Sequence, residues 1–257
     1  MRAKKSLGQN FLMHAQTAER IAEGAQVTAE DTVLEIGPGT GKLTRALLAR
    51  AKKVIAIEAD AQLEAQLRAA RAQEIASGKL ELIAGDARHF DTSTIAGPYK
   101  LVANIPYYIT GELIRQFLTA PHQPESMTLL VQKEVAERVA REEKGSLLSL
   151  SVRVYGTPAY LFTVPRGAFV PAPSVDSAVL RIHGIHRSFA SPAAEQRFFE
   201  VLRAGFAHKR KLLRGNLEQV AEPTNVLAAF ASCKIAENAR AEDLSISEWQ
   251  ALAAALA

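Results

Sequence analysis

Short apolar runs alternate with amphipathic stretches along the first half of the chain. Between the runs, residues 43–50 and 61–72 place apolar side chains at helical spacing. The runs are rich in β-branched and aliphatic residues, have the length of buried strands, and occupy residues 32–36, 54–57, 80–84, 99–103 and 127–131. Strands that alternate with helices in this way are typical of βαβ units on a parallel sheet, so we predict an α/β fold.

Glycine-rich or polar segments follow four of these runs directly. They are Gly37-Pro38-Gly39-Thr40-Gly41, Glu58, Gly85-Asp86-Ala87 and Asn104-Ile105-Pro106-Tyr107. In an open α/β sheet, ligands bind beyond the carboxyl ends of the strands. We therefore expect all four segments to lie along one edge of the sheet and to form the site.

The pattern changes after the fifth run. Residues 146–156 alternate like a strand but also suit a buried helix, and periodicity does not decide between the two. Prolines then mark an extended region, and residues 178–182 look like a late strand. Beyond Gly184 the pattern is helical, with Ser191-Pro192 as a start signal for a helix over 193–207. We predict two domains, residues 1–185 and a small all-helical domain over 186–257.

Charge is distributed unevenly along the 257 residues, whose net charge is +4. Residues 1–17 and 201–217 each carry several basic residues and no acidic one, which indicates a polyanionic partner. We expect these basic residues to contact nucleic-acid phosphates. They are Arg2, Lys4, Lys5, Arg203, Lys209, Arg210, Lys211 and Arg214.

The composition excludes several classes of protein. A single cysteine, Cys233, rules out a disulfide framework and a cysteine cluster for a metal. The histidines and serines show no spacing typical of a metal site or a catalytic triad, so we expect no metal and no covalent intermediate. Because no apolar run has the length of a membrane span or a secretion signal, we expect a protein that works in the cytoplasm.

The segment from Glu35 to Gly41 places glycines between a strand and a helix, where the backbone can approach a ligand closely. A tight turn without a ligand and a nicotinamide site are the alternatives. The spacing is G-x-G-x-G rather than the G-x-G-x-x-G of dinucleotide sites, and Pro38 removes one amide that could hold a pyrophosphate. The segment therefore favours a different nucleoside cofactor.

Two carboxylates follow the next two runs in order. Glu58 stands where an acid can accept both ribose hydroxyls of a nucleoside, and Asp86 stands where an acid can accept from an adenine amine. Either acid could instead cap a helix that begins nearby. Their order after the glycine turn favours a cofactor that contains adenosine.

The segment Asn104-Ile105-Pro106-Tyr107 is the most specific signal in the chain. The lone pair of an adenine N6 amine is delocalised into the ring, so a catalyst must localise it toward a methyl donor. The Asn104 side-chain oxygen and the Ile105 carbonyl can accept from the amine protons, and Tyr107 offers a face on which an extruded base can stack. Pro106 fixes the turn so that the acceptors converge. The alternative, a turn packed against the core, fits poorly beside the cofactor motifs.

Together these motifs resemble those of the ribosomal RNA adenine N6,N6-dimethyltransferases, over almost the whole chain. The resemblance rests on KKSLGQNFL at 4–12, EIGPGTGKLT at 35–44, GDA at 85–87 and NIPYYI at 104–109. Within the family, FVPAPSVDSA at 169–178 and AGFAHKRK at 204–211 resemble the small-subunit branch rather than the resistance enzymes that act on the large subunit. The resemblance implies a Rossmann-like S-adenosylmethionine-dependent methyltransferase domain, a helical RNA-binding C-terminal domain, and a helix over 146–156.

The resemblance also implies roles for single residues. Phe169 would complete a sandwich around the target base with Tyr107; the alternative is an ordinary core phenylalanine. The residues implied to bind S-adenosylmethionine are Asn10 and Leu12 over the cofactor, Gly37 at its methionine part, Glu58 at the ribose, Asp86 at the adenine, and Asn104, which would also touch the target amine.

The implied reaction is N6,N6-dimethylation of two adjacent adenosines in the 3′-terminal hairpin loop of 16S rRNA. The substrate would be the small ribosomal subunit or its precursor, and the enzyme would act as a monomer in small-subunit biogenesis. Two alternatives stay open: the same chemistry on 23S rRNA, and an RNA-binding assembly factor in which catalysis is secondary. A nicotinamide-dependent oxidoreductase is a weaker third.

Overall fold

The computed structural model describes residues 8–208 and 210–256. Four of the predicted RNA-binding residues, Arg2, Lys4, Lys5 and Lys209, lie outside this part of the chain. The described residues form two compact units. Unit 1 holds residues 8–140 and 156–186, and unit 2 holds residues 141–155 and 187–256.

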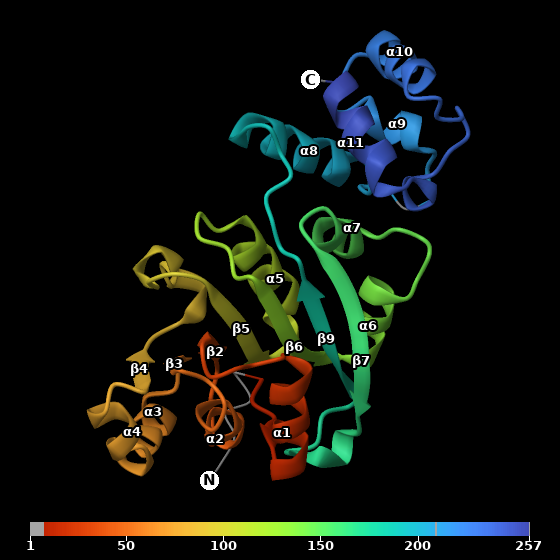
Figure 1. Cartoon of the computed structure of the whole chain (residues 1–257). Coiled ribbons are helices and arrows are strands. Elements are labelled where there is room, and N and C mark those ends of the chain that lie inside the picture. The colour runs from red at the N-terminus through yellow and green to blue at the C-terminus, as the bar shows by residue number, and fades with distance from the viewer. Residues whose placement is uncertain (1–7, 209, 257) are drawn as a thin grey trace. The chain divides into compact units, whose positions relative to one another are not determined.

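Unit 1 is built on a seven-stranded sheet (Figure 1). Along the sheet the strands follow the order β4-β3-β2-β5-β6-β9-β7. The first five are parallel, whereas β9 runs antiparallel to both of its neighbours. Their bounds are β2 Thr32–Ile36, β3 Lys53–Glu58, β4 Leu80–Ala84, β5 Tyr99–Asn104, β6 Ser126–Gln132, β7 Thr157–Val164 and β9 Ser177–His183.

The strand order reverses beside β2. The chain first adds β3 and β4 on one side of β2 and then returns to place β5 and β6 on the other side. Ligands bind beside such a reversal, beyond the carboxyl ends of the strands. The turns that follow β2 and β5 therefore flank the expected binding position.

The predicted strands are confirmed, including the late strand at β9, while β7 was predicted only as an extended region. Pro158 lies inside β7, and the pairing with β9 shifts register between Tyr160 and Phe162. Because β7 lies at one edge of the sheet, it tolerates a proline that a central strand would not. Because proline is rare inside strands, the hydrophobic pattern of this segment does not predict a strand.

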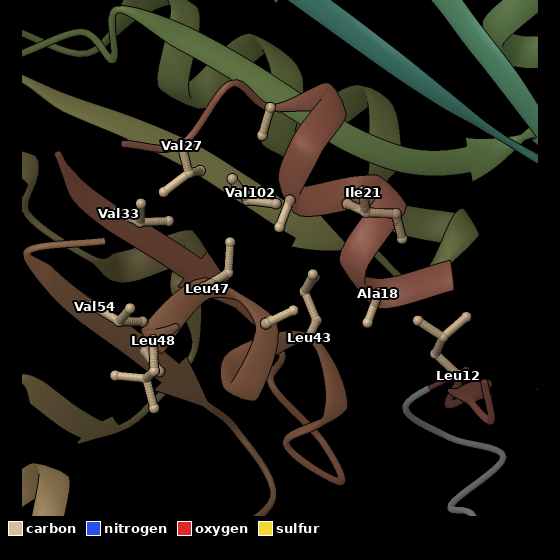
Figure 2. Close-up of a cluster of buried hydrophobic side chains, with 14 of the residues drawn as sticks. Leu12, Ala18, Ile21, Val27, Val33, Leu43, Leu47, Leu48, Val54 and Val102 are labelled. Carbon is tan, nitrogen blue, oxygen red and sulfur yellow. The ribbon is translucent and has the colours of Figure 1, made fainter. Parts of the chain in front are cut away.

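Helices α1 (Ala15–Gly24) and α2 (Lys42–Leu48) pack together over one face of the sheet. Figure 2 shows Ile21 of α1 and Leu47 of α2, both completely buried, among the side chains of the strands. Burial of this apolar surface contributes roughly 25 cal/mol per Å² to folding. The other α-helices described in unit 1 are α3 Ala61–Ala70, α4 Ala72–Ala76, α5 Thr110–Thr119 and α6 Lys133–Ala140.

A separate antiparallel ribbon joins two segments that lie far apart in the sequence. Strand β1 (Phe11–Leu12) pairs with β8 (Phe169–Val170), with Leu12 opposite Phe169. Next to it, Met13 N donates to Ala168 O at 2.8 Å. The ribbon fixes the segment before α1 against the segment that leads into β9.

Unit 2 consists of helices, as the sequence predicts for most of it (Figure 1). The predicted start of α8 is confirmed, because Ser191 Oγ accepts from Ala194 N at 3.2 Å and Pro192 is the first helical residue. Phe206, which follows α8, stacks on Trp249 of α11 with 5.7 Å between ring centroids. The helices are α7 Leu147–Arg153, α8 Pro192–Gly205, α9 Leu213–Leu217, α10 Pro223–Ser232 and α11 Ile246–Ala255.

The segment 141–155 differs from the expectation that residues 1–185 form one domain, because it packs within unit 2. Its helix α7, implied by the family resemblance, is confirmed and starts with a capping box between Ser146 and Ser149. Gly145 N donates to Glu242 O at 2.8 Å, and the Tyr155 ring stacks on Phe199. These partners lie far along the chain, so local periodicity gives no sign of them. Within the two described stretches, no helix is both long and apolar enough to cross a membrane.

Candidate active site

A cavity lies at the carboxyl edge of the sheet in unit 1. All four segments expected there contribute to its wall, and a fifth comes from residues 8–12, which we call the strap. The lining residues are 8–12, 36–40, 57–59, 85–88 and 104–109, with Lys42, Leu43 and Leu63. The cavity thus joins five segments that are separated in the sequence.

The glycine turn between β2 and α2 adopts a backbone that other residues disfavour. Gly37, Gly39 and Gly41 have φ angles of +66°, +56° and +74°. A Cβ atom on Gly37 would have only Asn104 O within 4 Å, at 3.8 Å, so this wall of the cavity stays open. A Cβ atom on Gly41 would lie 2.6 Å from Leu67 Cδ1 of α3. Gly37 therefore leaves room for a ligand, and Gly41 permits close helix packing.

Glu58, at the end of β3, is tied to the glycine turn. Its Oε2 accepts from Gly39 N and its Oε1 accepts from Asp60 N, both at 2.9 Å. Burial raises the pKa of Glu58, because the residue is only 6 % exposed, and the two backbone donors oppose this shift. Each carboxylate oxygen has two lone pairs, so acceptor positions remain for two hydroxyl groups.

Asp86 lies at the cavity and also caps a short helix, so the capping interpretation is confirmed and the contact with an adenine amine stays a prediction. Its side chain accepts from Arg88 N at 2.9 Å at the start of the 3₁₀ turn Ala87–His89. The Arg88 guanidinium pairs with the same carboxylate, with 2.6 Å between Nη2 and Oδ2. This hydrogen bond lowers the pKa of Asp86 and keeps it an ionised acceptor.

Glu35 of β2 is an acid that sequence reasoning did not assign to the site. It is 1 % exposed, and neither of its carboxyl oxygens has a hydrogen-bond partner among the described residues. Burial raises the pKa of Glu35 to about 8; the Thr44 hydroxyl, which lies close without a hydrogen bond of standard geometry, opposes this shift, and the nearby Glu58 carboxylate adds to it. Burial therefore favours the protonated form of Glu35. Its position inside a strand, among residues that read as a buried run, was the available signal.

Asn104 ends β5 and lies at the cavity, where the sequence predicts it. Its side-chain Nδ2 donates to the backbone carbonyl of Asn10 in the strap at 3.0 Å. An amide group has its donor and its acceptor on opposite sides, so this bond leaves Oδ1 free to accept. Asn104 is partly exposed and lines the cavity. The arrangement presents one fixed acceptor to a ligand amine.

Tyr107 follows Pro106, whose φ of −55° starts the 3₁₀ turn Tyr107–Ile109. The hydroxyl groups of Tyr107 and Ser177 lie 2.6 Å apart, and Ser177 is completely buried at the start of β9. Burial raises the pKa of the Tyr107 phenol, so it stays neutral. Sequence reasoning missed Ser177 because the bond joins the turn after β5 to the start of β9, which lie far apart in the sequence.

Phe169 is not brought to the cavity. It is 2 % exposed and belongs to the hydrophobic cluster that also contains Leu12, its partner across the β1–β8 ribbon. Its contact with a target base stays a prediction, while its packing role is evident. Leu12 is itself 5 % exposed and anchors the end of the strap in the core.

The basic residues predicted to bind RNA differ in their surroundings. Arg203, Arg210 and Lys211 of unit 2 are exposed. Arg214, in contrast, forms ion pairs with Glu237 at 3.2 Å and Glu218 at 3.6 Å. The first three side chains are therefore accessible to phosphates, and Arg214 would first have to leave its acidic partners.

The fold and this site define a Rossmann-like methyltransferase. Among solved structures, the 23S rRNA methyltransferase ErmE is similar with a TM-score of 0.75 and 28 % identity, covering 96 % of this chain and 99 % of that chain. A dimethyladenosine transferase from Plasmodium falciparum is similar with a TM-score of 0.80 and 26 % identity, covering 94 % and 95 %.

The sequence comparisons narrow the class. The family model described as ribosomal RNA adenine dimethylase matches residues 1–257. A ribosomal RNA small subunit methyltransferase A from Dehalococcoides mccartyi is 42 % identical, over 98 % of this chain and 88 % of that protein. A protein of the same name from Deinococcus radiodurans is 37 % identical, over 100 % of this chain and 86 % of that protein. The chain belongs to the ribosomal RNA adenine dimethylase family, and it is an enzyme that uses S-adenosylmethionine.

The cavity fits this cofactor. The open wall at Gly37 suits the methionine part, whereas the acceptors Glu58 and Asp86 suit ribose hydroxyls and an adenine amine. The three features follow β2, β3 and β4 in that order, so they can span one extended nucleoside ligand. The nicotinamide alternative is not supported, because the family model and the similar structures are methyltransferases.

Proposed function

We propose that this protein transfers methyl groups to N6 of two adjacent adenosines in the 3′-terminal hairpin loop of 16S rRNA. The observation that carries the proposal is the orientation of Asn104, whose Nδ2 is bound to Asn10 O while Oδ1 is left as an acceptor at the cavity. An amine with a delocalised lone pair needs such an acceptor, because a bond from its proton localises the pair on nitrogen.

The enzyme's own residues position and polarise the target. When bound, S-adenosylmethionine supplies an electrophilic methyl group on a sulfonium. Asn104 Oδ1, with the Ile105 carbonyl, accepts from the amine protons and directs the nitrogen lone pair into line with that group. The new N–C bond forms as the methyl–sulfur bond breaks, and the methylated nitrogen then loses a proton to water. No general base is needed, because an alkylated aromatic amine is acidic while it carries the extra proton.

Tyr107 holds the base. Tyr107 lines the cavity, and the bond to Ser177 fixes the position of its phenol oxygen. Bases in a hairpin loop are cheaper to extrude than paired bases, and aromatic stacking contributes about 1–3 kcal/mol per base. Phe169 is proposed as the second aromatic of the sandwich, which requires that its side chain leave the hydrophobic cluster around Leu12 when RNA binds. The monomethylated product keeps one N–H for Asn104, so a second transfer uses the same acceptor.

Unit 2 is proposed to bind the RNA backbone. Arg203, Arg210 and Lys211 are its exposed basic residues in the acid-free segment, and they suit phosphate contact. Arg2, Lys4, Lys5 and Lys209 are proposed to add to this surface. We propose that the protein acts as a cytoplasmic monomer without a metal, on the small subunit or its precursor.

Methylation of 23S rRNA is the second candidate, because the similar structure ErmE is a 23S rRNA methyltransferase. Two observations favour the small subunit. The relatives named for small-subunit rRNA are 37–42 % identical, against 28 % for ErmE. The segments 169–178 and 204–211 also resemble the small-subunit branch.

The test offers isolated small and large ribosomal subunits, both lacking their adenosine methylation, to the purified protein with methyl-labelled cofactor. The proposal expects label in the small subunit. Incorporation into the large subunit alone would establish the second candidate.

A further inference from the structure

We propose that the strap, residues 8–12, positions the catalytic amide of Asn104 as well as covering the cofactor, so that the acceptor for the target amine is correctly oriented only when the strap is closed. The inference rests on the proposed function in one respect, the acceptor role of Asn104. It assigns a positioning role to Gly8 and to the backbone of Asn10.

The strap is attached to the rest of unit 1 at several successive residues. Gly8 lies against the ring of Tyr108, since a Cβ atom on Gly8 would be 3.1 Å from Cδ1 and from Cε1. Gln9 Nε2 donates to Asp60 Oδ2 at 3.1 Å. Phe11 lies over the glycine turn, where a Cβ atom on Gly39 would be 3.2 Å from its ring. The strap therefore crosses the cofactor cavity in a defined conformation.

The attachments place one carbonyl at the catalytic residue. Asn10 folds its own side chain back, so that Nδ2 donates to Gly8 O at 3.2 Å, while Asn10 O accepts from Asn104 Nδ2 at 3.0 Å. The φ of +57° at Gly8 belongs to this turn. A change in the strap at Gly8 is thus transmitted to the partner of Asn104 two residues later.

The carbonyl selects one of the two orientations of the Asn104 amide. A backbone carbonyl only accepts hydrogen bonds, so the Asn104 amine side must face it and Oδ1 must face away. In the flipped orientation two oxygens would oppose each other, and Oδ1 would not be offered to a target amine. Asn10 O is the hydrogen-bond partner that holds the amide in the productive orientation. Closure of the strap over the cofactor thus also orients the Asn104 amide for the target amine.

The test displaces the strap at Gly8 and leaves the side chains of Asn104, Asn10 and Leu12 as they are. Gly8→Val introduces a branched side chain at positive φ and into the Tyr108 ring, and Gly8→Ala is a milder form of the same change. Gly78→Val is the matched control, because Gly78 has a φ of +76° and nothing within 4 Å of its Cβ position. This control introduces the same kind of backbone strain, a valine at positive φ, at a position that does not contact the strap.

Two readouts are measured. The first is kcat at saturating RNA and cofactor, beside the Kd for S-adenosylhomocysteine from calorimetry. The second is hydrogen exchange of the Asn104 side-chain amide by NMR in the protein alone, which needs neither RNA nor methyl transfer. A displacement near 1 Å at a reacting group can cost about a hundredfold in rate, so we expect Gly8→Val to lower kcat at least tenfold. We expect faster exchange at Asn104 Nδ2, a smaller change in Kd than in kcat, and no effect of Gly78→Val on either readout.

Other results would overturn the inference. If Gly8→Val and Gly8→Ala weaken S-adenosylhomocysteine binding while kcat at saturation is unchanged, the strap is a cofactor cover only. Unchanged exchange at Asn104 in both variants would show that the strap does not hold the amide. Should the wild-type protein fail to label small subunits, the proposed function fails, while the exchange measurement still decides whether the strap holds Asn104.

Discussion

The phenol oxygen of Tyr107 lies 2.6 Å from the hydroxyl oxygen of Ser177, a residue 70 positions further along the chain. This bond fixes the aromatic ring at the cavity to the first residue of β9, a strand that pairs on both sides. The surface proposed to stack the target base is therefore held by the sheet and not only by its own turn.

Ser177→Ala should weaken methylation by loosening that ring. Loss of one hydrogen bond costs about 0.5–1.5 kcal/mol, and a partly buried phenol left without a partner costs more. We expect kcat to fall roughly threefold to tenfold with unchanged binding of S-adenosylhomocysteine. Steady-state kinetics and calorimetry check this. Tyr107→Phe removes the other partner of the same bond and should lower kcat by no more than Ser177→Ala does. A larger fall in kcat would contradict a purely positional role for the bond.

Asn104→Ala should greatly slow methyl transfer while the protein still binds small subunits. The substitution removes the acceptor that polarises the amine, and loss of one such preorganised group typically costs about 100-fold to 1,000-fold in kcat. Filter binding with labelled subunits separates binding from catalysis. Methylation at the wild-type rate by Asn104→Ala would show that another group accepts from the target amine.

Glu35 should make the stability of unit 1 depend on pH. Its pKa is about 8 in the folded protein and 4.5 as an ordinary glutamate, so unfolding exposes a group that ionises more readily. The contribution of protonated Glu35 is fully present below about pH 4.5 and is lost as pH rises toward 8, with a limiting slope of about 1.4 kcal/mol per pH unit.

Glu35→Gln keeps the shape of the side chain and cannot ionise. We expect its free energy of unfolding to fall less with pH between about 5 and 8 than that of the wild type, as measured by urea unfolding. Glu58, whose pKa is also raised by burial, is retained in both proteins and leaves a common residual slope. Parallel curves for the two proteins would mean that Glu35 is ionised in the folded state.

Basic residues of unit 2 should differ in their contribution to RNA affinity. Each phosphate contact contributes about 0.7–0.9 to the slope of log affinity against log salt concentration. We expect Arg210→Ala to reduce the slope by roughly this amount, because Arg210 is exposed. Arg214→Ala is the matched comparison and should change it less, since Arg214 is paired with Glu218 and Glu237. Equal effects would show that Arg214 leaves its ion pairs when RNA binds.

Much of the fold follows from local pattern. The parallel strands are short apolar runs followed by glycine or polar residues, and their carboxyl ends meet at one edge because parallel strands share a direction. The sequence pattern alone therefore places Gly37, Glu58, Asp86 and Asn104 together, and all four line the cavity. Strand β7 could not be predicted, because Pro158 breaks its pattern at a sheet edge where the fold tolerates it.

The contacts that orient the site are those that the sequence does not reveal. Asn10 and Asn104 are 94 positions apart, and nothing local to either residue indicates which side of the amide is bound. Phe169 shows the opposite case. The family resemblance assigns it to the target base, whereas its side chain packs in the core beside Leu12. The grouping of residues 141–155 with unit 2 likewise depends on distant partners such as Glu242.

The central claim is tested most directly by locating the methyl groups at nucleotide resolution. Small subunits lacking the modification are incubated with the protein and cofactor, and the rRNA is digested and analysed by mass spectrometry. The account predicts N6,N6-dimethyladenosine at two adjacent positions in the 3′-terminal hairpin loop of 16S rRNA, and far less with Asn104→Ala. Dimethyladenosine found only in 23S rRNA when both subunits are offered would contradict it.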